Sequence, residues 1–311
     1  MFKFFQNLGR SLMLPVAVLP AGAIITGIGN LLNALHVLPT VAMFFSIVGT
    51  AILGQLGLIF AIGVAIGMAK KNDGAVALAG ALGYAMVTKV LNPENVATLF
   101  NIKEKAVNLG FTKMDNSNVF LGIIIGLIAA YSFNKFSEVE LPMALSFFSG
   151  KRLVPIMTVF FSTILAVILL FIWPMVFSGI VAFGEWLVGF GSFGAFLYGV
   201  FNRLLIPTGL HHALNAVFWF DTAGINDIGK FQTGVDAVKG ITGRYQAGFF
   251  PIMMFGIPAA ALAMYHSAET KQQKQVWGWF LASAISAFVV GVTEPIEFAF
   301  MFVAPVLFII H

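Results

Sequence analysis

The fold class follows from residues Val154–Ser178, VPIMTVFFSTILAVILLFIWPMVFS. This run carries no charged residue and exceeds the roughly 20 residues that an α-helix needs to cross a bilayer. The whole chain has the same character, with 59% hydrophobic and only 10% charged residues, whereas a soluble domain is about 45–50% apolar and about 25% charged. The sequence therefore predicts an all-α polytopic membrane protein with about eight to ten membrane segments.

Further apolar runs, bounded by polar loops, are candidate spans. They are Leu12–Leu35, Ala42–Ala69, Gly74–Leu91, Val119–Asn134, Ile180–Phe201, Phe249–His266 and Val276–Val292. Phe298–His311 is also apolar but shorter than a span, so we expect a chain that is truncated at its C-terminus. Ile206–Trp219 is short and carries Pro207 and Gly209, which indicates a re-entrant hairpin rather than a full crossing.

The basic residues indicate the orientation of the chain, whose net charge is +4. Lys3 and Arg10 precede the first span, and Lys70 and Lys71 follow the second. Because positive residues favour cytoplasmic loops, the N-terminus is predicted to lie in the cytoplasm. The basic residues are scattered in short loops, so they form no basic face of the kind that binds nucleic acid.

Cysteine is absent from the chain. Its absence excludes disulfides, thiolate metal sites and a cysteine nucleophile within these residues. No two histidines have the i, i+4 spacing of a zinc site, and no phosphate-binding loop pattern is present. We therefore expect no metal and no other cofactor.

Two short polar segments interrupt the apolar sequence, and each places a titratable group beside Pro and Gly. The first polar segment is Arg203–His212, RLLIPTGLHH, and the second polar segment is Gly291–Pro295, GVTEP. Charge and irregular backbone at membrane depth are tolerated where they line a cavity or a substrate path. We predict that a polar substrate binds where the two segments meet. Both lie late in the chain, so residues 1–150 are predicted to be a scaffold and residues 151–311 a substrate-binding transport domain.

The two charged residues of these segments each allow two interpretations. An ionised Glu294 needs hydrogen-bond donors, such as backbone N–H groups or the hydroxyls of a sugar. The alternative is a structural carboxyl group that is protonated or paired with Arg203. Arg203 itself either extends to the membrane interface or holds a sugar or phosphate oxygen with its guanidinium group.

The neighbouring uncharged groups suit a sugar. His211 and His212 are adjacent, so they point to different sides, and one can face the substrate while the other packs. A purely structural role for both histidines is the alternative. Asn202 and Asn215 carry hydrogen-bonding amides of the kind that sugars need.

These motifs resemble those of a known family, the membrane component (EIIC) of phosphotransferase-system sugar permeases in the glucose superfamily. The segments that carry the resemblance are Asn202–His211 (NRLLIPTGLH), Gly291–Phe298 (GVTEPIEF) and Met13–Pro20 (MLPVAVLP). Two more are most similar to the N-acetylglucosamine-specific branch, namely Phe249–Gly256 (FFPIMMFG) and Ala259–Tyr265 (AAALAMY). The resemblance runs from Phe4 to His311.

The resemblance implies group translocation by a homodimer in the bacterial plasma membrane. The 6-hydroxyl of the transported sugar takes a phosphoryl group from a phosphocysteine on a cytoplasmic partner domain, EIIB, which this cysteine-free chain cannot supply. Re-entrant hairpins are expected to carry His211 and Glu294 as the catalytic pair. The resemblance implies Thr293 and Arg203 as neighbouring sugar contacts, with His212 as a further position. The predicted substrate-binding residues also include Gly209, Asn215 and Gly256.

Other function classes fit the same residues. An ion-coupled secondary sugar transporter would use Glu294 as a proton relay. A non-catalytic membrane fragment would only assemble with a partner that supplies further spans. Within the family itself, another hexose or a disaccharide is an alternative substrate, because an acetamido group needs only one or two extra contacts.

Overall fold

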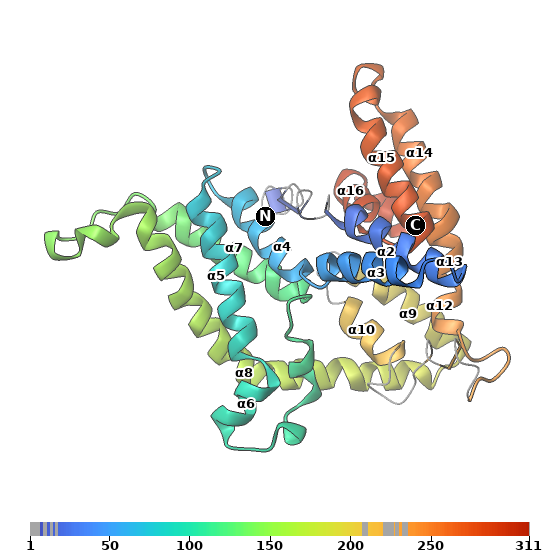
Figure 1. The fold of residues 1–311 in the computed structure, drawn as a ribbon, viewed down its shortest axis with the longest axis horizontal. Helices are drawn as coiled ribbons and strands as arrows, with labels where there is room; N and C mark the ends of the chain where they lie inside the picture. Colours follow the sequence, from blue (N-terminus) through green and yellow to red (C-terminus); the bar gives the residue numbers. More distant parts are fainter. Residues whose placement is uncertain are drawn as a thin grey trace. The chain divides into compact units, whose positions relative to one another are not determined.

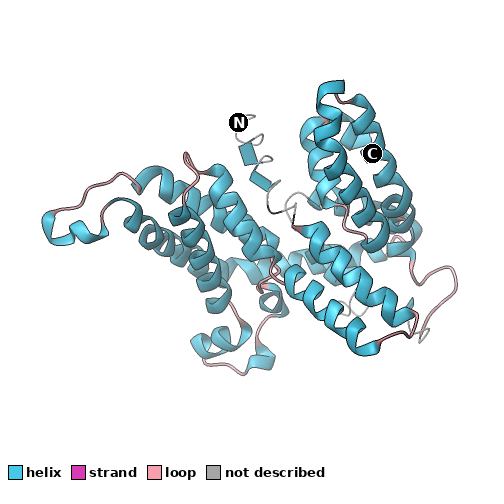
Figure 2. Ribbon diagram, turned by 45° about the horizontal axis from the view of Figure 1, so that its top comes forward, coloured by secondary structure: helices cyan, strands magenta, loops and turns pink. Residues whose placement is uncertain are grey.

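The structure is a computed structural model that describes residues 7–8, 11–12, 15, 18–206, 211–219, 227, 230–231 and 236–310. Every regular element in these ranges is a helix (Figure 2). The chain forms two compact units. The terminal unit comprises Met1–Gln55 and Ala247–His311, and the central unit comprises Leu56–Gln246. The predicted scaffold and transport halves, 1–150 and 151–311, are a functional division and stay a prediction.

The central unit contains most of the long helices. In chain order its elements are α4 (Leu56–Met68), α5 (Gly74–Val90), α6 (Pro93–Phe100), η1 (Glu104–Ala106), η2 (Leu109–Lys113), α7 (Val119–Phe136), η3 (Met143–Phe148), η4 (Gly150–Arg152), α8 (Leu153–Val188), α9 (Ser192–Leu205) and α10 (His211–Phe218). The short helix α12 (Arg244–Ala247) begins within the last three residues of this unit. Helices α4, α5, α7 and α8 pack side by side (Figure 1).

Close backbone contact joins α4 to α7. A Cβ atom at Gly126 of α7 would lie 2.8 Å from the Ala61 carbonyl oxygen of α4. Only glycine allows the helices to approach this closely, as is usual where small residues mediate packing in membranes. The fully buried Tyr84 places its hydroxyl 2.9 Å from the Asp115 carbonyl oxygen and so ties α5 to the turn before α7.

Helix α8 is longer than the sequence predicted. A boundary near residue 179 was expected between two spans, Val154–Ser178 and Ile180–Phe201, and this expectation was wrong. The helix continues through Pro174 to Val188, and the chain breaks only at Gly191, where φ is +60°. Glycine adopts this conformation without the steric cost that a Cβ atom brings, so the break falls there.

The terminal unit contains the first and last helices. They are α2 (Leu19–Ala34), α3 (Pro39–Leu53), α13 (Phe249–Pro251), the π-helix η7 (Ile252–Gly256), α14 (Ile257–Ser267), α15 (Thr270–Val290), α16 (Glu294–Val303) and α17 (Pro305–Ile310). Helices α2 and α3 form a tight hairpin, and α14, α15 and α16 surround a small apolar core (Figure 1). This core contains Ile257, Ala261, Ala287 and Ile296.

Length and composition identify the helices that can cross a membrane. Among the described residues, three qualify: Val119–Phe136, Gly150–Val188 and Arg244–Ser267. The number rises to five if each of two bent helix pairs is one span, and Ile24–Ala34 and Val276–Val289 are shorter apolar helices. The all-α membrane architecture is therefore confirmed, while the larger number of segments and the two re-entrant hairpins stay predictions.

Candidate functional site

The first polar segment lies in the central unit, between α9 and α10. Arg203 is in the last turn of α9, and its two terminal guanidinium nitrogens are shielded from solvent. Gly209 and its neighbours 207–210 lie outside the described residues. His211 then begins α10. The imidazole thus stands at the start of a helix, and the side chain of His212 is not among those described.

One face of α10 is buried. His211, Asn215 and Phe218 follow each other at i, i+4 and i+7, so they share a face of the helix. Their exposed fractions are 7%, 8% and 0%. The predicted catalytic histidine and the predicted sugar-binding asparagine therefore lie on the same buried face, one turn apart.

Side-chain hydrogen bonds hold this face against α9. The Tyr198 hydroxyl donates to Asn215 Oδ1 at 2.8 Å, and Asn202 Nδ2 donates to the same oxygen at 2.5 Å. Asn202 Nδ2 is also 3.3 Å from the Tyr198 hydroxyl oxygen. Both lone pairs of the Asn215 carbonyl are thereby used within the protein. Of this side chain, only the amide N–H groups remain for a ligand.

Aromatic rings close the same cluster. The ring of Phe218 lies 4.4 Å from that of Tyr198 and 4.7 Å from that of Tyr245, measured between centroids. The buried Asp227 carboxylate accepts hydrogen bonds from the backbone N–H groups of Gly243, at 2.8 Å, and Tyr245, at 3.3 Å. Asp227 therefore holds the turn that presents Tyr245 to α10.

The sequence interpretation missed these supporting residues. Tyr198 and Tyr245 resemble ordinary apolar positions in the sequence, and Asp227 is one acid in a polar, glycine-rich stretch. Within the described part of the chain, the Tyr245 hydroxyl and the Gln246 amide nitrogen are buried without a hydrogen-bond partner. Buried polar groups normally have partners, so these two are candidates to bind a ligand or water. In the sequence, the only feature that could have pointed to Tyr245 and Gln246 is their position shortly before the Gly248–Pro251 run (GFFP).

The second polar segment lies in the terminal unit, at the start of α16. Gly291 ends α15 with φ of +81°, and Thr293 precedes the first helical residue, Glu294. The Thr293 carbonyl accepts hydrogen bonds from the backbone N–H groups of Ile296 and Glu297, each at 3.1 Å. Both glutamates of the first turn thus stand at the positive end of the helix dipole, which favours negative charge.

Burial distinguishes the two glutamates. Glu297 is 1% exposed, and Thr293 is 7% exposed. Glu294 is only partly buried, although its Oε2 atom is shielded from solvent. This difference in burial suits the predicted role of Glu294, whose side chain is expected to face the substrate.

Gly256 belongs to a π-helical turn beside the second polar segment. It is the last residue of η7, and π-helical turns are frequent at functional sites. Met253 of the same turn lies against Gly291, because a Cβ atom on Gly291 would come within 2.8 Å of the Met253 sulfur. The structure therefore brings the Gly256 turn close to the residues just before Thr293 and Glu294.

The predicted site residues form two sets. His211, Asn215 and Arg203 belong to the central unit. Thr293, Glu294 and Gly256 belong to the terminal unit. That the two sets meet at one sugar, and that Glu294 pairs with Arg203 in the alternative interpretation, stay predictions.

Comparison with known proteins gives consistent matches. The family described as phosphotransferase system, EIIC, matches residues 9–311. An N-acetylglucosamine-specific EIICB component from Bacillus subtilis (strain 168) is 45% identical over 311 residues, covering 100% of this chain and 64% of the relative. An N-acetylglucosamine-specific EIICBA component from Escherichia coli (strain K12) is 45% identical over 322 residues, covering 99% of this chain and 45% of the relative.

A shorter relative is covered more fully. The N-acetylglucosamine-specific EIIC component of Streptomyces coelicolor is 43% identical over 326 residues, covering 100% of this chain and 76% of the relative. The chain thus spans between about half and three quarters of these relatives' lengths. The matched residues of this chain include the segments around His211 and Glu294.

Proposed function

Since the chain belongs to the EIIC family of the phosphotransferase system, we propose that it binds N-acetylglucosamine and carries it across the bacterial plasma membrane during coupled phosphorylation. The protein is a multi-pass membrane protein of this system. One observation carries the choice of sugar: relatives at 43–45% identity over the full chain are named as N-acetylglucosamine-specific. Glucose is the second candidate, because a glucose-specific EIICBA component from Staphylococcus saprophyticus is 40% identical over 337 residues.

The proposed sugar site combines the two sets of residues. Glu294 accepts hydrogen bonds from sugar hydroxyls, and its place in the first turn of α16 stabilises the ionised carboxylate. The central unit supplies hydrogen-bond donors from the Asn215 amide, the His211 imidazole and the Arg203 guanidinium. His212, Thr293, Gly209 and Gly256 complete the predicted contacts.

The phosphoryl group comes from a partner, because this chain has no cysteine. In the proposed reaction the 6-hydroxyl oxygen of the sugar attacks the phosphorus of a phosphocysteine on an EIIB domain. The P–S bond breaks, the thiolate leaves, and the new P–O bond forms on the sugar. Either Glu294 or His211 orients the hydroxyl and takes its proton.

The remaining proposals concern the assembly of the chain and its orientation in the membrane. The chain works as a homodimer, with its N-terminus and the loops that carry Lys70, Lys71, Lys151 and Arg152 in the cytoplasm. This orientation follows the preference of basic loops for the cytoplasmic side. It places EIIB on the side to which the sugar is delivered.

The function is tested with the full chain in proteoliposomes, supplied with an EIIB domain, the soluble phosphocarrier proteins and phosphoenolpyruvate. We expect radiolabelled N-acetylglucosamine to accumulate as its 6-phosphate, and only when phosphoenolpyruvate is present. Excess unlabelled glucose should compete less well than excess unlabelled N-acetylglucosamine.

Two outcomes would contradict the proposal. Accumulation of unmodified sugar driven by a proton gradient without phosphoenolpyruvate would support the ion-coupled transporter instead. Failure of the purified chain to bind any sugar by calorimetry, together with no phosphorylation in the reconstituted system, would support a non-catalytic fragment.

A further inference from the structure

The connection between α7 and α8 is a closed loop with a fixed base. At its base the Gly150 N–H donates to the Val139 carbonyl oxygen at 2.9 Å, and the Leu141 N–H donates to Ser149 Oγ at 2.9 Å. Gly150 has φ of +64°, a conformation that glycine adopts at little cost. These bonds define the apolar loop, residues 141–149. In Figure 1 the loop is green and extends from the left edge of the central unit, away from the helices.

The apolar loop exposes four large apolar side chains. Met143 is 93% exposed, Leu145 50%, Phe147 67% and Phe148 42%. Scattered exposed apolar residues are ordinary, but a contiguous set on a projecting loop marks a surface that contacts another protein or a membrane. The hydrogen-bonded base keeps these side chains outward, because the loop is too short to fold back over them.

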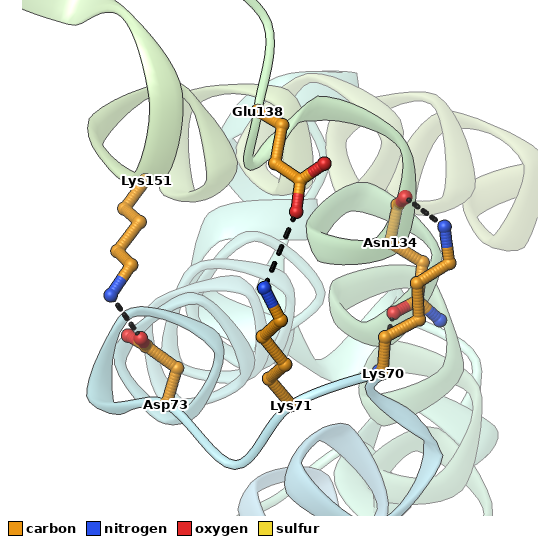
Figure 3. Close-up of polar contacts among 6 residues, drawn as sticks. All are labelled: Lys70, Lys71, Asp73, Asn134, Glu138 and Lys151. Atoms are coloured by element: carbon orange, nitrogen blue, oxygen red, sulfur yellow. Dashed lines mark hydrogen bonds and ion pairs between the residues drawn. The ribbon is translucent and has the colours of Figure 1, made fainter.

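Ion pairs join the base of the loop to a second loop. Lys71 lies 3.5 Å from Glu138, and Lys151 lies 2.5 Å from Asp73 (Figure 3). The α4–α5 loop and the α7–α8 loop therefore lie together at one end of the central unit. Lys70 adds a third link, because its Nζ donates to the Asn134 carbonyl oxygen at 3.2 Å.

Cations surround the exposed apolar residues at this end. The Arg152 guanidinium lies 4.6 Å from the centre of the Phe147 ring and donates to the Phe147 carbonyl oxygen at 3.0 Å. Lys70 and Lys135 are also exposed. Basic residues at this end outnumber carboxylates. They are Lys70, Lys71, Lys135, Lys151 and Arg152 against Asp73, Glu138 and Glu140.

The loop also adjoins a helix that is long and apolar enough to cross a membrane. Helix α8 begins at Leu153, after the short helix η4 that follows the loop, and the two together form a candidate span. The first turns of α8 expose Ile156 and Phe160, at 45% and 56%. In a membrane-spanning α8 these exposed side chains face lipid, which puts the apolar loop at the level where the helix leaves the hydrocarbon. Aromatic rings and basic side chains are enriched at that level of a membrane.

We propose that the apolar loop is a membrane-interface anchor. Met143, Leu145, Phe147 and Phe148 insert between the lipid headgroups of the leaflet at this end, and the neighbouring cations contact acidic headgroups. Apolar insertion combined with basic residues is the usual basis of interfacial binding to anionic membranes. A lipid surface fits better than a soluble protein, because the loop adjoins a helix that is long and apolar enough to cross a membrane. The proposal does not depend on the transported sugar.

The anchor is tested by measuring the depth of single labels. Because the chain contains no cysteine, Met143→Cys and Phe147→Cys each introduce one site for a nitroxide label. Matched controls are Phe160→Cys on the exposed side of α8 and Lys105→Cys in the exposed loop at the opposite end of α5 and α7. The full chain is reconstituted in phosphatidylcholine vesicles with and without phosphatidylglycerol. Collision rates with oxygen and with a water-soluble nickel complex then report the depth of each label.

We expect labels at 143 and 147 to favour oxygen over the nickel complex, with a ratio between those of the Lys105 and Phe160 controls. Added phosphatidylglycerol should shift both labels deeper. If the labels at 143 and 147 are as accessible to nickel as the Lys105 control in both vesicle types, the anchor is overturned. If these labels lie at the same depth with and without phosphatidylglycerol, the role of acidic headgroups is overturned. Shielding that appears only when a purified EIIB domain is added would identify a protein-docking surface and contradict the proposal.

Discussion

The Tyr198 hydroxyl donates a 2.8 Å hydrogen bond to Asn215 Oδ1 and so links α9 to α10 inside the central unit. Both side chains are buried, at 0% and 8% exposed. Asn215 stands one helical turn after His211, so this bond sets how α10 is rotated about its axis. The orientation of the predicted catalytic histidine therefore depends on a tyrosine that the sequence did not single out.

Tyr198→Phe should weaken this link while keeping the ring packed. Net loss of one buried hydrogen bond costs about 0.5–1.5 kcal/mol of unfolding free energy. We expect a lower unfolding temperature in detergent and weaker N-acetylglucosamine binding by calorimetry. Tyr131→Phe is the matched control. Because Tyr131 is 51% exposed, this substitution should leave the unfolding temperature and the sugar binding unchanged. Unchanged sugar binding in Tyr198→Phe would contradict the positioning role.

Gly126→Ala tests the contact between α4 and α7. The added methyl group would lie 2.8 Å from the Ala61 carbonyl oxygen and 2.7 Å from Val64 Cβ. Overpacking of this kind costs about 1–3 kcal/mol, so the unfolding temperature should fall. Gly179→Ala in α8 is the control, since a Cβ atom there meets nothing within 4 Å, and removing a helical glycine should stabilise by up to about 1 kcal/mol. Equal effects of the two substitutions would show that the helices do not touch at Gly126.

The Asp73–Lys151 pair predicts a dependence of stability on pH. The Lys151 ammonium group and the Ala75 backbone N–H hold the pKa of Asp73 below its ordinary value. A carboxyl group with a lowered pKa in the folded state contributes stability that is present above the unfolded pKa, about 3.9 for aspartate. That contribution is lost as the pH falls below this value and through the lowered folded pKa.

Thermal unfolding of Asp73→Asn should therefore differ from that of the unsubstituted protein at neutral pH and converge with it in acid. Asp236→Asn is the control, because Asp236 is exposed and its φ of +55° suits asparagine equally well. A difference for Asp73→Asn that stays constant down to pH values well below about 3.9 would exclude the ion pair as its source.

Glu294→Gln and His211→Ala should each abolish coupled uptake and phosphorylation of N-acetylglucosamine in the reconstituted system. General acid–base catalysis typically contributes about 10²–10⁴-fold to a rate, so a loss in that range is expected for the residue that takes the proton. The other variant should lose uptake mainly because it binds the sugar more weakly. Separate measurement of sugar binding and single-turnover phosphorylation assigns the two roles.

The controls for these two variants are another glutamate and another histidine, both in the terminal unit. Glu269→Gln and His266→Ala change exposed residues of the terminal unit and should leave transport intact. Normal uptake in both Glu294→Gln and His211→Ala would exclude the proposed catalytic pair.

The site was only partly predictable. The residues of the two polar segments stand out because a charge beside Pro and Gly is costly in an apolar chain. The side chains that hold them do not stand out. Tyr198 and Tyr245 follow no motif, and the partners of Asp227 are backbone N–H groups 16 and 18 residues away along the chain.

The sequence by itself determined the class of the protein. Long runs without charge allow only helices that satisfy their own backbone in a bilayer, and the motifs around His211 and Glu294 identify the family. Only the tertiary structure decided which side chains share a face. The burial of the His211–Asn215–Phe218 row and the pairing of Lys71 with Glu138 depend on contacts between distant residues. Such contacts arise from packing and long-range hydrogen bonds, which no local periodicity encodes.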